Sequence, residues 1–141
     1  MYPILLSIHS VIRWIFLAGL ILLLLKSWAG WRGKRAWGAF DNRLGMALTI
    51  VADVQLLTGA LLYLIFSPVT NGIWADFYKV LYSPSFQFFG IFHFLMMTAA
   101  VFLLHWMRRQ TKSTASDQGK YRWAFLSTAL ALLLVILAIP W

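Results

Sequence analysis

The fold of this chain is decided by residues 1–28, MYPILLSIHSVIRWIFLAGLILLLLKSW. Residues 2–25 are almost wholly apolar, and a helix needs about 20 such residues to cross a bilayer. The stretch also holds His9 and Arg13, which are four positions apart and therefore share one helix face. Because a charged side chain is costly in hydrocarbon, we expect this face to meet protein, a cofactor or a water-filled cleft, not lipid.

The composition indicates a membrane protein with a single domain, residues 1–141. Of the 141 residues, 62% are hydrophobic and 11% are charged, which is too little polar surface for a soluble domain of this length. The first segment lacks the basic start and the small-residue cleavage site of a signal peptide, so we expect it to be a membrane span. The sequence has no cysteine, which excludes disulfides, iron–sulfur clusters and thiolate metal sites.

Hydropathy predicts four membrane-spanning helices, at about residues 3–25, 44–66, 86–107 and 121–141. Of the twelve Lys and Arg residues, ten fall in two short segments, residues 26–43 and 108–122, at the connections between the first and second spans and between the third and fourth. This bias predicts that both basic loops are cytoplasmic and that both termini lie on the other side. We therefore expect an all-α integral membrane protein, an up-down-up-down four-helix bundle. Because the positive charge follows the topology, it does not indicate a nucleic-acid partner.

The loops carry weaker signals. The first loop, residues 26–43, is rich in Trp and basic residues, a composition typical of an interfacial belt that contacts lipid headgroups. In the middle loop, Trp74, Phe77, Tyr78 and Leu81 fall at helical spacing. This pattern predicts a short amphipathic helix on the outer membrane surface.

Two of the three histidines lie at matching depth in the predicted spans. At 1.5 Å per residue, His9 is roughly 9 Å and His93 roughly 10 Å from the outer ends of their spans. The first and third spans run parallel in this topology, so both imidazoles can reach one site in the bundle core. A b-type haem requires two such axial imidazoles, because its iron takes one ligand on each face. The alternative is that each histidine makes only a hydrogen bond between helices.

Arg13 suits a haem site because haem propionates are anionic and bind cationic or hydrogen-bonding groups. The third span also offers apolar side chains for the walls of such a site: Phe89, Phe92, Met96 and Met97. These four residues equally suit ordinary helix packing. In the competing interpretation, Arg13 forms a salt bridge with Asp53 of the second span, and the histidines are structural.

His105 is less easily placed in a cofactor site. It lies roughly 28 Å from the outer end of the third span, near the cytoplasmic interface. No other histidine is available at that depth to hold a second haem with it. We interpret His105 as an interfacial histidine, with a quinone or proton contact as the alternative. The chain has no Ser–His–Asp arrangement, HExxH motif, phosphate loop or carboxylate pair, which favours a non-catalytic role over an enzyme.

A family resemblance runs in order along nearly the whole chain. It is carried by LLSIHSVIRW, FDNRLGMAL, VQLLTGALLYLIFSP, FHFLMMTAAVFLLH and AIPW. Together these stretches resemble small four-helix bacterial membrane proteins labelled cytochrome B. The resemblance implies a location in the bacterial inner membrane and matches His9, His93 and His105 to histidines of the family. Where this chain has Asp53, the family carries histidine, and the change removes one ligand from any version with two haems.

Two functions follow as expectations. The first is a membrane-embedded electron-transfer protein of a respiratory or photosynthetic chain, with haem b held by His9 and His93 and steadied by Arg13. The alternative is a haem-free accessory subunit that packs against a larger membrane energy-converting complex. Both interpretations have the lipid bilayer and a larger membrane complex as partners.

Overall fold

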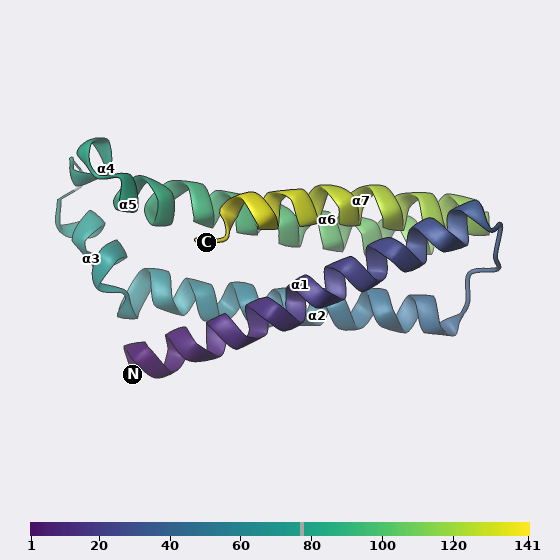
Figure 1. The fold of residues 1–141 in the computed structure, drawn as a ribbon, viewed down its shortest axis with the longest axis horizontal. Coiled ribbons are helices and arrows are strands. Elements are labelled where there is room, and N and C mark those ends of the chain that lie inside the picture. Colours follow the sequence, from purple (N-terminus) through teal and green to yellow (C-terminus); the bar gives the residue numbers. More distant parts are fainter. Residues whose placement is uncertain (77) are drawn as a thin grey trace.

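The computed structural model describes residues 1–76 and 78–141, and that part of the chain is built from helices and connecting turns without any strand (Figure 1). Four helices are long and apolar enough to cross a membrane: Tyr2–Arg32, Ala39–Phe66, Pro84–Ser113 and Asp117–Ala138. The all-α class and the presence of four apolar helices of spanning length are therefore confirmed. Such helices fit a lipid bilayer, as expected of a multi-pass membrane protein.

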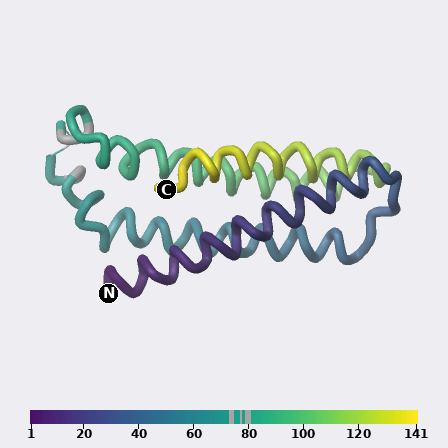
Figure 2. The backbone as a smooth tube through the Cα atoms, in the orientation of Figure 1, coloured from purple at the N-terminus to yellow at the C-terminus, as the bar shows by residue number. Residues whose placement is uncertain are grey.

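Two of the spans contain π-helical turns, called η1 and η2 below. In chain order the helical segments of the described residues are α1 (Tyr2–Arg32), α2 (Ala39–Leu61), η1 (Leu62–Phe66), α3 (Pro68–Ala75), α4 (Lys79–Tyr82), α5 (Pro84–Gln87), η2 (Phe88–Phe92), α6 (His93–Ser113) and α7 (Asp117–Ala138). Successive long helices run in opposite directions in Figure 1. The tube in Figure 2 shows short connections at one end of the molecule and the short helices at the other.

The basic loops are shorter than predicted. Most of residues 26–43 is helical, because α1 continues to Arg32 and α2 begins at Ala39. Arg and Lys are good helix formers, so a helix need not end where the hydropathy falls. The chain turns just after α1, where Lys34 has a φ of 49° in the left-handed region.

The single amphipathic helix predicted across residues 74–81 is split in the structure. Helix α3 ends at Ala75, and Asp76 is extended, with φ −152° and ψ 94°. Among the residues that predicted this helix, Phe77 and the side chain of Trp74 lie outside the described part of the chain. An extended residue interrupts the helical hydrogen bonds, so the spacing of apolar residues alone predicted too long a helix.

Most of the buried core lies in the half of the bundle near the basic loops, and it continues along α7 to Val135 and Ile139, near His93. In α1 the buried positions begin at Phe16, and every earlier residue of this helix is at least partly exposed. The core is completed by residues of the other three long helices: Leu48, Ala52, Ala100, Val101, Leu104, Ala124, Ala131 and Val135. Alanine at these positions allows close approach of the helices. Helix α1 crosses the others obliquely in Figure 1, and its residues before Phe16 contribute no buried residue to this core.

A buried polar cluster closes the basic end of the bundle. Asp41, in the first turn of α2, is only 5% exposed. Its carboxylate accepts hydrogen bonds from the Lys26 ammonium at 2.9 Å, the Gly38 N–H at 2.9 Å and the Tyr121 hydroxyl at 3.1 Å. The indole ring of Trp37 packs edge-on against the Tyr121 ring, with centroids 4.8 Å apart. These contacts tie the connection between α1 and α2 to α7.

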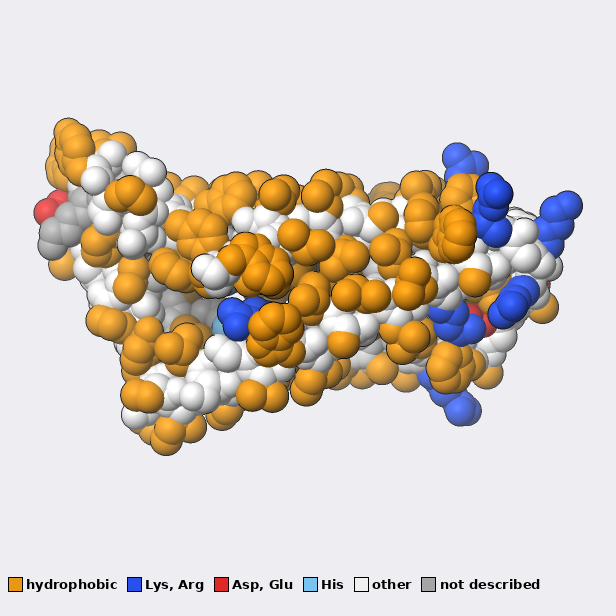
Figure 3. All heavy atoms as spheres, viewed as in Figure 1, with side chains coloured by type: hydrophobic (Ala, Val, Ile, Leu, Met, Phe, Trp, Pro, Cys, Tyr) orange, Lys and Arg blue, Asp and Glu red, His pale blue; other side chains and the backbone are white. Residues whose placement is uncertain are grey.

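The sides of the long helices are apolar, and Lys and Arg side chains gather at one end of the molecule (Figure 3). Many large apolar side chains on the long helices are more than half exposed, among them Trp14, Ile15, Leu22, Leu57 and Leu133. Apolar side chains of this kind are unfavourable in water and favourable against acyl chains. The helices also satisfy their own backbone hydrogen bonds, so this surface exposes almost no polar backbone to lipid.

Candidate functional site

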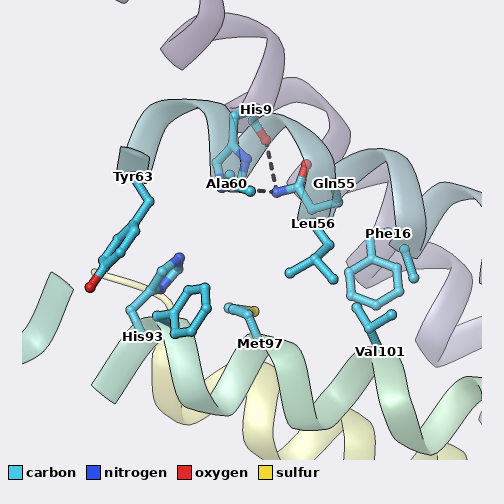
Figure 4. A pocket seen from close by; sticks show the side chains of 12 residues that line it. His9, Phe16, Gln55, Leu56, Ala60, Tyr63, His93, Met97 and Val101 are labelled. Carbon is cyan, nitrogen blue, oxygen red and sulfur yellow. Dashed lines mark hydrogen bonds between the residues drawn. The ribbon is translucent and has the colours of Figure 1, made fainter. Parts of the chain in front are cut away.

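His9 and His93 lie side by side where the bundle is open, away from the basic end. His9 projects from α1 and His93 from the first turn of α6, and their ring centroids are 6.5 Å apart with 63° between the ring planes. Figure 4 shows the two rings facing one cavity from different helices. The meeting of these two histidines, predicted from their matching depth, is found in the structure.

Two adjoining hollows flank the histidines, and both His9 and His93 line each of them. The first, of about 60 Å³, lies among α1, α2 and α6 and reaches Met97. The second, of about 260 Å³, is lined by Arg13, Phe89 and residues of the α3 region. Together they fall at the lower end of the roughly 300–1,000 Å³ that small-molecule sites occupy.

His9 is held by a hydrogen-bond network on α2. The Thr58 hydroxyl donates to the Gln55 carbonyl at 3.0 Å, and His9 Nδ1 lies 3.2 Å from the same hydroxyl oxygen. Because that hydroxyl proton is engaged, we assign the ring proton to Nδ1, which donates to Thr58. The Gln55 side-chain amide then donates to His9 Nε2 at 3.2 Å and to the His9 carbonyl at 3.0 Å. The imidazole is therefore neutral, with Nε2 as its acceptor.

His93 is oriented by the end of α7. Its Nδ1 donates to the carbonyl oxygen of Ala138 at 2.7 Å. Ala138 is the last residue of α7, so this carbonyl has no partner within its own helix. The bond fixes the Nδ1–H tautomer of His93 and leaves Nε2 as the ring nitrogen available to a ligand.

The π-helical turns border this site. η1 follows α2, and η2 directly precedes His93. A π-helical turn inserts an extra residue and rotates the side chains that follow it, and such turns are frequent at functional sites. The Tyr63 hydroxyl of η1 donates to the Gly90 carbonyl of η2 at 2.8 Å, which ties the two turns together. The turn before His93 therefore helps to set the direction of its ring.

Gly59 allows the His9 ring to lie against α2. A Cβ atom at this position would come within 3.1 Å of His9 Cε1, closer than ordinary van der Waals contact. Any larger residue would push the ring away from Thr58 and Gln55. The absence of a side chain at Gly59 is therefore part of the site's geometry.

Arg13 lines the larger hollow one turn after His9. Its Nε is buried without a hydrogen-bond partner, and its guanidinium carbon lies 5.3 Å from the centre of the Trp14 ring. The ion pair predicted between Arg13 and Asp53 is wrong, because Asp53 Oδ1 lies 2.8 Å from His105 Nε2 instead. A buried guanidinium N–H that lacks an acceptor suits an anionic group in the cleft.

The predicted apolar walls are only partly found. Phe89 lines the larger hollow, with its ring centroid 6.1 Å from that of His93, and Met97 lines the smaller one. Phe92 is 37% exposed, and Met96 is partly buried and lines neither hollow. The η2 turn changes which side chains of the third span face inward, and helical spacing in the sequence does not reveal it.

The sequence placed Gln55 among the polar groups that bond across helices, but it did not connect Gln55, Thr58 or the Ala138 carbonyl with the two imidazoles. Gln55 and Thr58 are polar residues three positions apart in an apolar span, and this spacing is a usable signal. The Ala138 carbonyl has no sequence signal, because every residue carries one. Only the helix end before Pro140 indicates that such a carbonyl lacks an intrahelical partner.

The groups at this site that can bind a ligand are the imidazole nitrogens of His9 and His93 and the guanidinium of Arg13. No group of three or more His, Asp or Glu side chains that could hold a bare metal ion is found among residues 1–76 and 78–141. Comparison with protein-family models, curated proteins and solved structures finds no match to this chain. The interpretation of the site therefore depends on its residues alone.

Proposed function

We propose that this protein is a membrane-embedded electron-transfer protein that binds haem b between His9 and His93. The observation that carries the proposal is the separation of 6.5 Å between the two ring centroids. Because a metal–imidazole bond is only about 2.0–2.1 Å long, two rings must lie about as close as this to hold one metal together. His9 and His93 are the residues that would hold the haem.

The hydrogen bonds of both imidazoles support the same role. Thr58 and the Ala138 carbonyl engage the two Nδ1 atoms, as the partners of metal-bound histidines usually do. Nε2 of each ring is then the nitrogen that would hold the iron. Gln55 has to turn aside from His9 Nε2 when haem is bound. Its Oε1 has no hydrogen-bond partner, so only the bonds that its amide donates hold it in place.

Arg13 is the residue that meets a propionate in this proposal. Its buried, unpartnered Nε offers a charge-assisted hydrogen bond to a carboxylate in the larger hollow. When bound, the haem supplies one-electron chemistry. The chain's own residues orient the ligand and limit access of water, and Phe89 and Met97 form part of the apolar surface around it.

The proposed setting is the bacterial inner membrane. Lys and Arg gather at the end with the α1–α2 and α6–α7 connections, and we place this end on the cytoplasmic side (Figure 3). Both termini and the histidine site then lie toward the opposite leaflet. The resemblance to small bacterial membrane proteins labelled cytochrome B supports a place in a respiratory or photosynthetic chain, within a larger membrane complex.

The rival function, a haem-free accessory subunit, relies on a salt bridge between Arg13 and Asp53. The bond between Asp53 and His105 disfavours it, since it leaves Arg13 without that carboxylate. A structural arginine in a span is expected to be paired, whereas the Arg13 Nε has no hydrogen-bond partner.

The test is the dithionite-reduced minus oxidised spectrum of protein purified in detergent from cells supplied with δ-aminolaevulinate. We expect b-type Soret and α bands in the wild type and neither band in His93→Ala. His105→Ala is the matched control, and it should keep both bands because His105 bonds Asp53 and lines neither hollow. Circular dichroism and size-exclusion elution establish that each variant is folded. A wild-type protein without these bands rejects haem binding and leaves the accessory-subunit function.

A further inference from the structure

We propose that Asp53 and His105 form a second site, on the outer face of α2 and α6, which binds the ring of a lipid-soluble hydroquinone. His105 Nε2 and Asp53 Oδ1 are 2.8 Å apart, and the two side chains are 55% and 47% exposed, respectively. This pair is separate from His9 and His93. The inference rests on the proposed function in one respect, since it names the chemical class of the partner that exchanges electrons with the protein.

The depth of the pair restricts what can contact it. Asp53 lies in the middle of the second span, Ala39–Phe66, and about 15 Å along the helix axis from Arg43. An exposed ionisable side chain at this depth is costly against acyl chains and marks a functional site. Its exposed neighbours on α2 are apolar: Ile50, Val54 and Leu57. The ligand therefore has to be soluble in hydrocarbon and carry a polar group that reaches the bilayer interior.

The hydrogen bond between the two side chains determines what polar group is recognised. His105 Nε2 donates to the Asp53 carboxylate, so the neutral ring keeps a lone pair on Nδ1. In the described part of the chain, Nδ1 of His105 makes no hydrogen bond to the protein. A carboxylate behind an imidazole strengthens the other nitrogen as an acceptor, as it does in catalytic triads. The site therefore selects a hydroxyl donor.

Aromatic side chains next to His105 favour a flat ring as the carrier of that hydroxyl. Phe102 and Trp106 are 64% and 38% exposed, and their ring centroids lie 6.4 Å apart with 25° between the planes. The Arg109 guanidinium carbon lies 6.0 Å from the centre of the Trp106 ring, so the exposed Phe102 ring is the face left to stack on a flat ligand, in an offset or tilted arrangement. A hydroquinone combines an aromatic ring, a hydroxyl donor and an apolar tail.

The experiment uses the full chain in nanodiscs and a photoreactive azido derivative of a short-chain ubiquinol, kept in the reduced hydroquinone form, with the label located by mass spectrometry. We expect label near His105 and Asp53, removed by excess decylubiquinol. His105→Ala should lower labelling about tenfold or more, because the hydrogen bond to a charge-supported acceptor is lost. Asp53→Asn should lower it by a smaller factor, and it serves as the test if His105→Ala does not fold. Thr98→Ala is the matched control, since its exposed hydroxyl bonds only Phe94 of its own helix.

Equal labelling of the wild type and His105→Ala, or label that decylubiquinol does not displace, overturns the inference. A second copy of the chain would also cover Asp53 and His105. Because the chain has no native cysteine, such a dimer is simple to detect with one introduced cysteine. Disulfide-linked dimers of Val54→Cys, without labelling, would also overturn the inference. Spectra are recorded on the same samples: haem bands without labelling remove only this inference. Labelling without haem bands removes the proposed function and leaves the hydroquinone site standing.

Discussion

The two ends of the helix bundle differ in whether their buried polar groups have hydrogen-bond partners. At the basic end, the buried carboxylate of Asp41 is surrounded by donors, including the Lys26 ammonium. At the histidine end, the buried Nε of Arg13 and Oε1 of Gln55 lack partners, and hollows of about 260 and 60 Å³ open beside Arg13 and Gln55, respectively. Among the described residues of the basic end, the Trp37 indole N–H is the unpartnered buried group, and it carries no charge. The basic end therefore stabilises the fold, and the histidine end is shaped to receive a ligand.

The backbone also differs between the two ends: the helices are regular near the basic loops and irregular near the histidines. Near the basic loops the long helices are regular, and their buried residues form one close-packed core. Near the histidines the second and third spans contain η1 and η2, and the part of α1 that precedes Phe16 has no buried residue. Regular helices pack well together, whereas π-helical turns and a diverging helix leave space. Substitutions at the two ends should therefore separate stability from ligand binding.

The largest expected effect is the destabilisation caused by Asp41→Ala. The change leaves Lys26 without its carboxylate and should cost about 2–4 kcal/mol, toward the low end for a buried pair because the Lys26 side chain is 30% exposed. The apparent midpoint of thermal unfolding in detergent, followed by circular dichroism, measures the effect. Asp117→Ala is the control: its pair with Lys120 spans 3.5 Å at the surface, and its loss should cost about 0–1 kcal/mol. Equal midpoints for the two variants would contradict this account of the basic end.

Gly30→Ala should destabilise the same end by a different route. A Cβ atom at position 30 collides with the Tyr121 ring, and overpacking of this kind costs about 1–3 kcal/mol. The same thermal unfolding measurement applies. Gly19→Ala is the control, because its Cβ meets only the end of the Leu48 side chain, which can turn away. A Gly30→Ala protein as stable as the wild type would show that Tyr121 is not held in place.

Thr58→Val should change ligand binding without changing stability. Valine keeps the shape but removes the acceptor of His9 Nδ1, and loss of such a partner weakens metal-site affinity about 10–100-fold. Titration of the purified protein with haemin, followed by absorbance, measures the affinity. Thr49→Val is the control, since the Thr49 hydroxyl bonds the Gly45 carbonyl of its own helix near the basic end. Unchanged haemin affinity in Thr58→Val, with a lowered unfolding midpoint, would mean that Thr58 only stabilises α2.

Gly59→Ala is the smallest of the expected effects. Its Cβ would stand 3.1 Å from His9 Cε1, so the ring has to move by a few tenths of an ångström. We expect less than about a tenfold loss of haemin affinity, a shift of the α band and an unchanged unfolding midpoint. Gly30→Ala should instead lower the unfolding midpoint and leave the haemin affinity unchanged. If both glycine variants affect stability alike, the proposed division between the two ends is wrong.

Much of the candidate site could be predicted because helix geometry is regular. The rise of 1.5 Å per residue places His9 and His93 at one level once the spans are known. The partner of Asp53 could not be predicted in the same way. The side chains of Arg13 and His105 are both long enough to reach Asp53 from a neighbouring span. Which of the two bonds Asp53 depends on how each helix is rotated about its own axis. That rotation follows from contacts between helices, such as those of Ala52 and Ala100 in the core.

The sequence by itself determined the all-α class, the four apolar helices and the depth of each polar residue within them. These properties are local, since they depend on hydropathy and on the fixed geometry of the helix. Only the tertiary structure decided that His9 and His93 face each other, that Asp53 bonds His105, and that the Ala138 carbonyl orients His93. These pairings depend on helix rotation, on the π-helical turns and on where α7 ends. Each is a compromise among contacts from several helices, which no single stretch of sequence contains.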